Sequence, residues 1–178
     1  MNESLGFIIG EDGGGNPQVS KTINGGGSWT TTNLPISGLG FNGANKMFFF
    51  DSNIGYIVCR SGHIYKTTNQ GTDWDSLTSG TTEDLTSVHF PTSTVGYVSL
   101  MSSPAILKTT NGGTNWTSKP LPLFGVQDLF FTDANTGYLA CGNSTILKTT
   151  DGGDSWNVFS FGTTDAFYAI EFTSSNIG

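Results

Sequence analysis

Few side chains in this sequence have the types and spacing that metal binding or catalysis requires. His63 and His89 are the only histidines, and they show no zinc-ligand spacing. The acidic pair Glu11 and Asp12 precedes a run of glycines, which lacks the alternating oxygen ligands of a calcium loop. We therefore predict no metal site and no cofactor, with the histidines as packing or surface residues and the acidic insertion as a mobile loop.

The charge balance of the chain argues against nucleic-acid binding. Lysine and arginine together number 7 against 14 acidic residues, which gives a formal net charge of −7, and Arg60 is the only arginine. A nucleic-acid interface needs clustered basic side chains, which this sequence lacks. A pair of catalytic carboxylates for glycoside hydrolysis stays open at this point, because a sequence does not show how far apart two carboxylates lie in space.

The composition favours strands and turns over helices. The chain has 25 glycines, and its charged fraction is 12%, against about 25% in an average soluble protein. A length of 178 residues favours one domain that can bury a core without disulfides. The first residues include no basic region, and the apolar run after them stops at Gly10, so we expect neither a signal peptide nor a membrane-spanning segment in this chain.

Internal repetition decides the predicted fold. Four Lys-Thr pairs are each followed by a tryptophan eight residues after the lysine, and four glycines are each followed by an aromatic residue. Successive Gly-aromatic pairs lie 49, 41 and 41 residues apart, and from the second glycine onward a phenylalanine stands six residues before the glycine. These pairs are Gly6-Phe7, Gly55-Tyr56, Gly96-Tyr97 and Gly137-Tyr138, and the phenylalanines are Phe49, Phe90, Phe131 and Phe172, the last of which precedes Gly178.

Each unit is predicted to contain four short strands joined by polar turns. In the third unit these strands run from about Leu85 to Phe90, Gly96 to Met101, Ile106 to Thr110 and Asn115 to Lys119. A period of about 40 residues with four strands is typical of a β-propeller blade. The predicted fold is therefore all-β, a β-propeller of four-stranded antiparallel blades with four blades in a single domain, residues 1–178. The repeats cover about residues 6–54, 55–95, 96–136 and 137–178, and the longer first repeat carries loop insertions at 11–16 and 36–45.

The turn between the third and fourth strands of each unit is the most specific motif. We call these segments the tryptophan turns: residues 22–29, 67–74, 109–116 and 149–156. In each, the Asn or Asp side chain is expected to accept backbone N–H groups, and the glycine two residues later permits positive φ. The tryptophan is expected to anchor the hairpin while its indole N–H finds a partner. The residues with these structural roles are Asn24, Gly26, Trp29, Asn69, Gly71, Trp74, Asn111, Gly113, Trp116, Asp151, Gly153 and Trp156.

The tryptophan turns resemble the Asp-box, or BNR, repeat, of pattern Ser/Thr-x-Asp-x-Gly-x-x-Trp. The resemblance covers essentially the whole chain. Together with the phenylalanine six residues before Gly-Tyr, it is similar to the photosystem II assembly and stability factor-like propellers and to repeats of secreted bacterial adhesin-type proteins. Asp151 matches the pattern, whereas the other three turns have asparagine at this position. The resemblance implies that these turns are structural and lie on the blade periphery, and that the protein is secreted or displayed on a cell surface.

The same resemblance includes the sialidases, which would make this chain a glycoside hydrolase. Sialidases clamp the sugar carboxylate with three arginines, and lysine does not replace that planar, bidentate contact. With Arg60 as the only arginine, this chain is predicted to have no catalytic residues. We expect a non-catalytic interaction or assembly module that binds another protein. The alternative is a glycan-binding, lectin-like module.

One set of equivalent positions differs among the repeats and forms the candidate ligand site. The residue before the repeated phenylalanine reads Phe48, His89, Phe130 and Glu171. The residues just before these are all apolar, so the strand alternates and the four side chains share one face. This face either packs between blades or forms a ligand site at the mouth of the central channel.

Two further expectations concern the cysteines and the ring. Cys59 and Cys141 occupy equivalent positions in non-adjacent blades, too far apart for a disulfide, and are predicted to be buried free thiols. The second-strand segment from Gly6 to Gly10 and the first-strand segment from Tyr168 to Phe172 are complementary. Their pairing predicts a closed four-bladed monomer or a head-to-tail homodimer of eight blades, although a longer propeller would show the same pattern.

Overall fold

The computed structural model describes residues 4–35, 43–174 and 177–178. In these residues the strands form one three-stranded and three four-stranded antiparallel sheets, and a short 3-10 turn is the only helical element. The first sheet contains β1 (Gly6–Glu11), β2 (Pro17–Thr22) and β3 (Thr30–Asn33), and the second contains β4 (Ala44–Phe49), β5 (Gly55–Cys59), β6 (His63–Thr67) and β7 (Asp75–Thr78). The third contains β8 (Leu85–His89), β9 (Gly96–Leu100), β10 (Ala105–Thr109) and β11 (Thr117–Pro120), and the fourth contains β12 (Val126–Phe131), β13 (Gly137–Cys141), β14 (Thr145–Thr149) and β15 (Asn157–Ser160).

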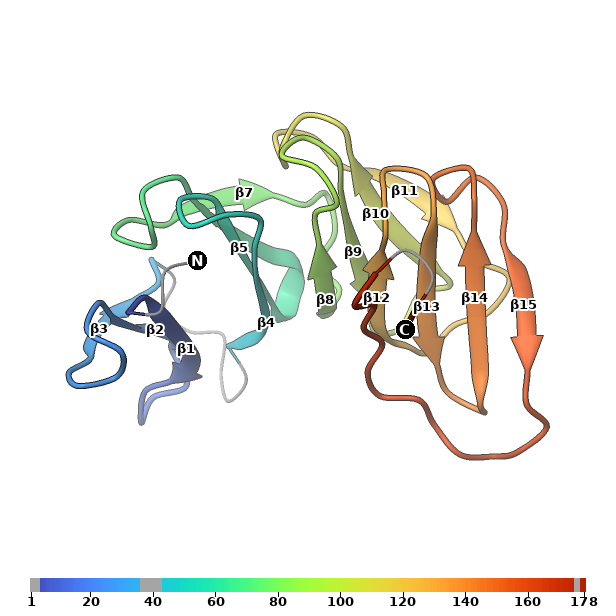
Figure 1. Ribbon diagram of the computed structural model, residues 1–178, viewed down its shortest axis with the longest axis horizontal. Helices are drawn as coiled ribbons and strands as arrows, with labels where there is room; N and C mark the ends of the chain where they lie inside the picture. The colour runs from blue at the N-terminus through green and yellow to red at the C-terminus, as the bar shows by residue number, and fades with distance from the viewer. Residues whose placement is uncertain (1–3, 36–42, 175–176) are drawn as a thin grey trace.

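Within each sheet the strands pair in the order in which they occur in the chain. The sheets follow one another along an arc, with β1–β3 at one end and β12–β15 at the other (Figure 1). The first strands of successive sheets, β4, β8 and β12, contact one another, and we call them the inner strands. This arrangement confirms the predicted β-propeller blades, and the observed strands of the third unit agree with the predicted ones to within one or two residues.

The second strand of each four-stranded sheet is the most deeply buried element. Every residue of β5 and β9 is buried, and four of the five in β13 are. Neighbouring sheets cover both faces of β5 and β9, and the sequences of all three strands are nearly continuous apolar runs without polar alternation. The predicted burial of the free thiols at Cys59 and Cys141 is confirmed, and burial raises their pKa values to about 12 and about 11.

Aromatic stacks join each sheet to the next, and they explain the repeated phenylalanine and glycine. Phe90, the residue that follows β8, lies flat against Tyr56 of the preceding sheet, with ring centroids 3.7 Å apart. The same ring fills the space beside Gly96, where an added Cβ would lie 2.3 Å from its Cε1 atom. Phe49 and Phe131 make equivalent contacts with Gly55 and Gly137. A side chain at these glycines would displace the ring that locks two sheets together.

The closed four-bladed monomer considered from the sequence is wrong for this structure. The first sheet has three strands, and residues 168–172 lie away from it, beside β12 (Figure 1). Those residues form no strand, since the described part of the chain offers them no strand partner, and this corrects the strand expected from Tyr168 to Phe172. A four-bladed ring needs a sharp turn between neighbours, and the large flat rings between these sheets oppose such a turn.

The two predicted insertions of the first repeat have different outcomes. The one at 11–16 is the loop between β1 and β2, where the Asp12 carboxylate accepts hydrogen bonds from the backbone of Gly14 and Asn16 and from the Asn16 amide. These bonds lower the pKa of Asp12, the amide of Asn16 contributing most. The carboxylate is therefore used by its own loop. The insertion at 36–45 lies mostly outside the described residues.

Candidate functional site

The tryptophan turns contain the hydrogen bonds that their sequence predicts. In the third turn the Oδ1 atom of Asn111 accepts the N–H of Asn115 at 2.9 Å and the hydroxyl of Thr109 at 2.9 Å, and the Thr109 hydroxyl accepts the N–H of Gly113. Gly113 has a φ of 89°, which a glycine adopts without strain. In the fourth turn the hydroxyl and N–H of Ser155 bind the carboxylate, which holds the pKa of Asp151 well below its ordinary value. The first and second turns, built around Asn24 and Asn69, repeat this pattern.

The tryptophans pack as anticipated at three of the four turns, but two details differ. Trp74, Trp116 and Trp156 lie edge-on to the repeated phenylalanines, with centroid separations of 6.0, 6.0 and 6.4 Å. The prediction that each indole N–H finds a hydrogen-bond partner is wrong. In all three tryptophans the buried Nε1 atom has no such partner among the described residues. The orientation of each indole ring is therefore set by its packing against a phenylalanine and not by a hydrogen bond of its N–H group. Trp29 is 43% exposed, because the first sheet contains no inner strand among the described residues to supply that phenylalanine.

The structure brings three of the four candidate ligand residues into one row. The ring of His89 lies between those of Phe48 and Phe130, with centroid distances of 4.6 and 4.4 Å. The three side chains come from the neighbouring inner strands β4, β8 and β12, and each is partly exposed. We call these three side chains the aromatic row. The next ring beyond Phe130 is that of Phe172, at 5.6 Å, whereas the fourth predicted residue, Glu171, is exposed beside the row.

His89 is held as a neutral imidazole in the aromatic row. Burial between the two phenyl rings lowers its pKa to about 4, the charge of Asp128 opposing this shift and that of Lys46 adding to it. Its Nδ1 atom accepts the N–H of Phe131 at 3.4 Å, so the imidazole is bound to the backbone of the adjacent inner strand. At neutral pH this ring therefore behaves as part of the aromatic surface.

A buried carboxylate next to the row was missed by the sequence reasoning. Asp128 is 4% exposed, and it binds the Nζ atom of Lys46 at 3.1 Å, the hydroxyl of Ser87 at 2.6 Å and the N–H of Ile170 at 3.2 Å. It thus ties all three inner strands to the segment that follows β15. The signal was present in the repeat, because residues 46, 87 and 128 are equivalent positions two residues before the aromatic row and therefore share its face.

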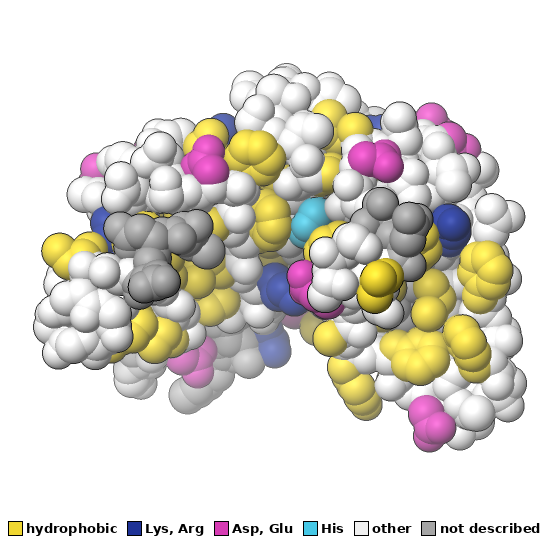
Figure 2. All heavy atoms as spheres, in the orientation of Figure 1, with side chains coloured by type: hydrophobic (Ala, Val, Ile, Leu, Met, Phe, Trp, Pro, Cys, Tyr) yellow, Lys and Arg dark blue, Asp and Glu magenta, His cyan; other side chains and the backbone are white. Residues whose placement is uncertain are grey.

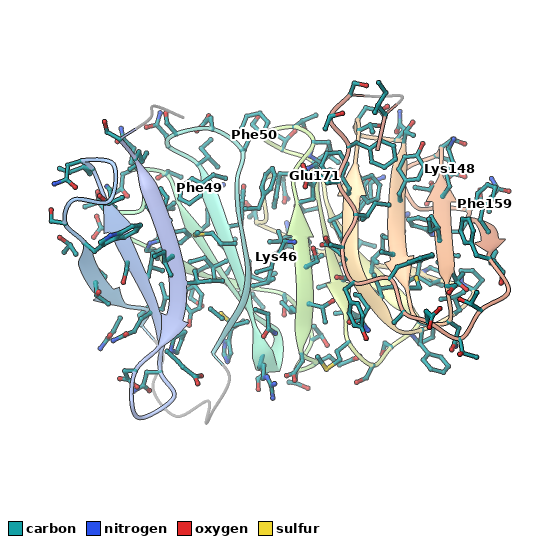
Figure 3. All side chains as sticks on the ribbon, turned by 60° about the horizontal axis from the view of Figure 1, so that its bottom comes forward. Lys46, Phe49, Phe50, Lys148, Phe159 and Glu171 are labelled. Atoms are coloured by element: carbon teal, nitrogen blue, oxygen red, sulfur yellow. The ribbon has the colours of Figure 1, made fainter. Side chains whose placement is uncertain are left out.

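Two hollows adjoin the aromatic row, and all three of its rings line both. The first has a volume of about 380 Å³ and is also lined by Lys46, Asp128 and Glu171. The second has a volume of about 340 Å³ and is lined by Phe50, Pro91 and Phe172, among others. Figure 2 shows a histidine with basic and acidic side chains gathered at the hollowed middle of this face, and Figure 3 shows Lys46 and Glu171 there, on β4 and on the segment after β15.

The polar side chains on this face are hydrogen-bonded to one another and to the backbone. Ser87, His89 and Asp128 are the residue types of a hydrolytic triad, but the serine hydroxyl donates directly to the aspartate and the imidazole accepts a backbone N–H. The imidazole is therefore not hydrogen-bonded to the serine hydroxyl, as it is in a Ser-His-Asp triad. Among the described residues no group of three or more His, Cys, Asp or Glu side chains is placed to hold a metal ion. Within the same residues, no helix is long and apolar enough to span a membrane.

No family model and no curated protein matches the sequence. Solved structures do match its fold. YCF48 bound to D1 peptide superposes with a TM-score of 0.54 at 18% identity, over 96% of this chain and 68% of that one. A GH74 enzyme of Niastella koreensis gives 0.68 at 20% identity, over 88% of this chain and 28% of that one. The computationally designed Ika8 protein gives 0.72 at 15% identity, over 98% of this chain and 51% of that one. The chain thus spans about two thirds of the first neighbour, about a quarter of the second and about half of the third, and what it shares with them is the β-propeller fold.

Proposed function

We propose that this chain is a non-catalytic module that binds another protein by holding an extended segment of it across the aromatic row. The observation that carries the proposal is the row itself. Three partly exposed rings from three separate strands lie side by side, with a hollow on either side. Partly exposed aromatic side chains over a hollow are the usual anchors of a protein interface.

The charges beside the row indicate the chemistry of the partner segment. Lys46 is engaged by the carboxylate of Asp128, whereas Glu171 is exposed at the edge of the same hollow. The chain as a whole carries a formal net charge of −7. An apolar or aromatic segment with one lysine or arginine beside it complements these features, since opposite charges at the edge of an interface favour association.

Two further observations support a binding function without catalysis. The imidazole of His89 accepts a backbone N–H and the Ser87 hydroxyl donates to Asp128, so these groups are not hydrogen-bonded in the order of a Ser-His-Asp triad. YCF48, which shares the fold, has a structure in which it is bound to a peptide. A propeller of this kind is therefore compatible with peptide binding.

The test is a peptide array screened with the labelled chain, followed by calorimetry on the peptides that bind. The variant Glu171→Gln should weaken binding of basic peptides about tenfold, and its stability should change by less than about 0.5 kcal/mol because the side chain is exposed. Asp75→Asn is the matched control, because Asp75 is an exposed carboxylate on the outer strand β7. Binding that is unaffected by Glu171→Gln and by Phe130→Ala, or a glycan array that yields ligands where the peptides yield none, would overturn the proposal.

A further inference from the structure

Successive sheets in this molecule are joined by a contact that also involves the tryptophan turns. Lys108 and Tyr97 of the third sheet both donate to the carbonyl of Gly152 in the next sheet's turn, at 2.9 and 3.3 Å. Lys66 and Tyr56 of the second sheet bind the carbonyl of Gly112 in the same way, at 2.9 and 3.1 Å. In each case the lysine Nζ atom also lies over the tyrosine ring. We call this arrangement the turn clasp.

The outer face of the fourth sheet carries the lysine and tyrosine of another turn clasp. Lys148 lies over the ring of Tyr138 with Nζ 5.3 Å from its centroid, and Phe172 is stacked on the same ring at 4.3 Å. No turn carbonyl in the described part of the chain binds Lys148 or Tyr138. Both line an apolar hollow of about 520 Å³ together with Ile146, Phe159 and Phe161. Figure 3 shows Lys148 and Phe159 on this outermost sheet.

The outer face of the first sheet carries the other component of a turn clasp, a tryptophan turn that contacts no preceding sheet in the described structure. Gly113 and Gly153 each lie against a side chain of the preceding sheet, Leu77 and Ile106 respectively. Gly26 is the equivalent glycine of the first turn, and within 4 Å of its Cβ position there is only the ring of its own Trp29. The exposure of Trp29 is 43%, against 7% for Trp74, and Ile8 on the same sheet is 55% exposed.

We propose that these two faces bind each other between two copies of the chain, head to tail. The first sheet of one copy would pack on the fourth sheet of the other, just as each later sheet within a chain packs on the sheet before it. Lys148 and Tyr138 would then hold the carbonyl of Gly25, and Trp29 would lie edge-on to Phe172. The same geometry occurs three times within the chain between Trp74, Trp116 or Trp156 and their phenylalanines.

Strand pairing also supports a second copy of the chain as the binding partner. The exposed edge of β1 has no inner strand beside it in the described structure, and an unpaired edge is a template for another strand. The segment around Ile170 is held at the position of an inner strand by its bond to Asp128. In the three complete sheets the residue before the repeated phenylalanine pairs with the aromatic residue after the glycine. By the same register Glu171 of one copy pairs with Phe7 of the other.

Sedimentation equilibrium on the full chain tests the contact. We expect a mass of twice the 18.9 kDa chain at micromolar concentration. Trp29→Ala and Lys148→Ala should each raise the dissociation constant about tenfold or more, because each removes a central side chain of the contact. Phe124→Ala is the control, since Phe124 is 72% exposed and does not line the hollow. A mass of 18.9 kDa at every concentration, or equal association of all three variants, would overturn the proposal.

A mixing experiment distinguishes head-to-tail contact from contact between two identical faces. Each variant alone is defective in every contact it makes with its own kind. A mixture of Trp29→Ala and Lys148→Ala chains restores one intact contact, between the fourth sheet of the first variant and the first sheet of the second. We expect the mixture to associate more tightly than either variant alone, and no gain on mixing contradicts the arrangement. The result is distinct from peptide binding, because neither Trp29 nor Lys148 lines the hollows beside the aromatic row and the readout here is mass.

Discussion

The ring of Phe131 lies flat on the ring of Tyr97, with centroids 3.5 Å apart and planes inclined by 2°. The two residues belong to β12 and β9, so this stack joins the fourth sheet to the third. Gly137 lies against the Phe131 ring, and an added Cβ there would be 2.3 Å from the Cε1 atom of that ring. The spacing of six residues between phenylalanine and glycine is therefore a packing requirement between sheets.

Gly137→Ala should destabilise the chain by about 2–3 kcal/mol, because the added methyl group must displace a ring that is packed on its other face by Tyr97. Urea unfolding followed by tryptophan fluorescence measures the loss. Gly142→Ala is the matched control, since nothing lies within 4 Å of its Cβ position and its φ is not positive. Equal losses for the two variants would show that the ring is not constrained as described.

The tryptophans of the turns should differ in their contribution to stability. Trp74→Ala and Trp116→Ala should cost about 3–5 kcal/mol, because each ring is packed edge-on against a phenylalanine of an inner strand. Trp29→Ala should cost about 1 kcal/mol or less when measured on the monomer, because that ring is 43% exposed. Urea midpoints at low protein concentration give the comparison. A loss well under 1 kcal/mol at both Trp74 and Trp116 would contradict their anchoring role.

Asp128 should be the most sensitive carboxylate of the molecule. Asp128→Ala should destabilise it by about 2–4 kcal/mol, because the buried Ser87 hydroxyl and the Ile170 N–H lose their acceptor and Lys46 loses its counter-charge. Asp154→Asn is the comparison, since Asp154 pairs with Lys119 at an exposed position and should cost less than about 1 kcal/mol. Thermal unfolding of both variants at neutral pH checks the order, and the reverse order would contradict it.

His89 should make stability depend on pH between about 6.5 and 4. Its pKa falls from 6.5 to about 4 on folding, so in this interval the unfolded chain binds more protons than the folded one. The contribution of the neutral imidazole is complete above about pH 6.5 and decreases as the pH falls toward 4. His89→Phe should remove much of this dependence, whereas His63→Gln should leave most of it. The test is to measure the unfolding midpoints of the unchanged chain and both variants across this pH range. Parallel plots of midpoint against pH would show that His89 does not cause the pH dependence.

The sequence by itself determined the β-propeller fold, the strands other than that expected from Tyr168 to Phe172, and the hydrogen bonds of the tryptophan turns. These features depend on residues close together in the chain and repeated at a fixed spacing. Asn111, Thr109 and Gly113, for example, close their turn within a few residues. The alternation of polar and apolar positions also placed Phe48, His89 and Phe130 on one face, and the structure brings these three rings together.

Only the tertiary structure decided what neighbouring sheets do to one another. The stack of Phe131 on Tyr97 and the buried bonds of Asp128 join residues more than 30 positions apart. Such contacts depend on the angle and distance between sheets, which the packed rings set and which local sequence does not encode. The same cause explains the difference between Trp29 and Trp74. Their turns have nearly the same sequence pattern, but in the part of the chain that the structure describes only the sheet of Trp74 contains an inner strand.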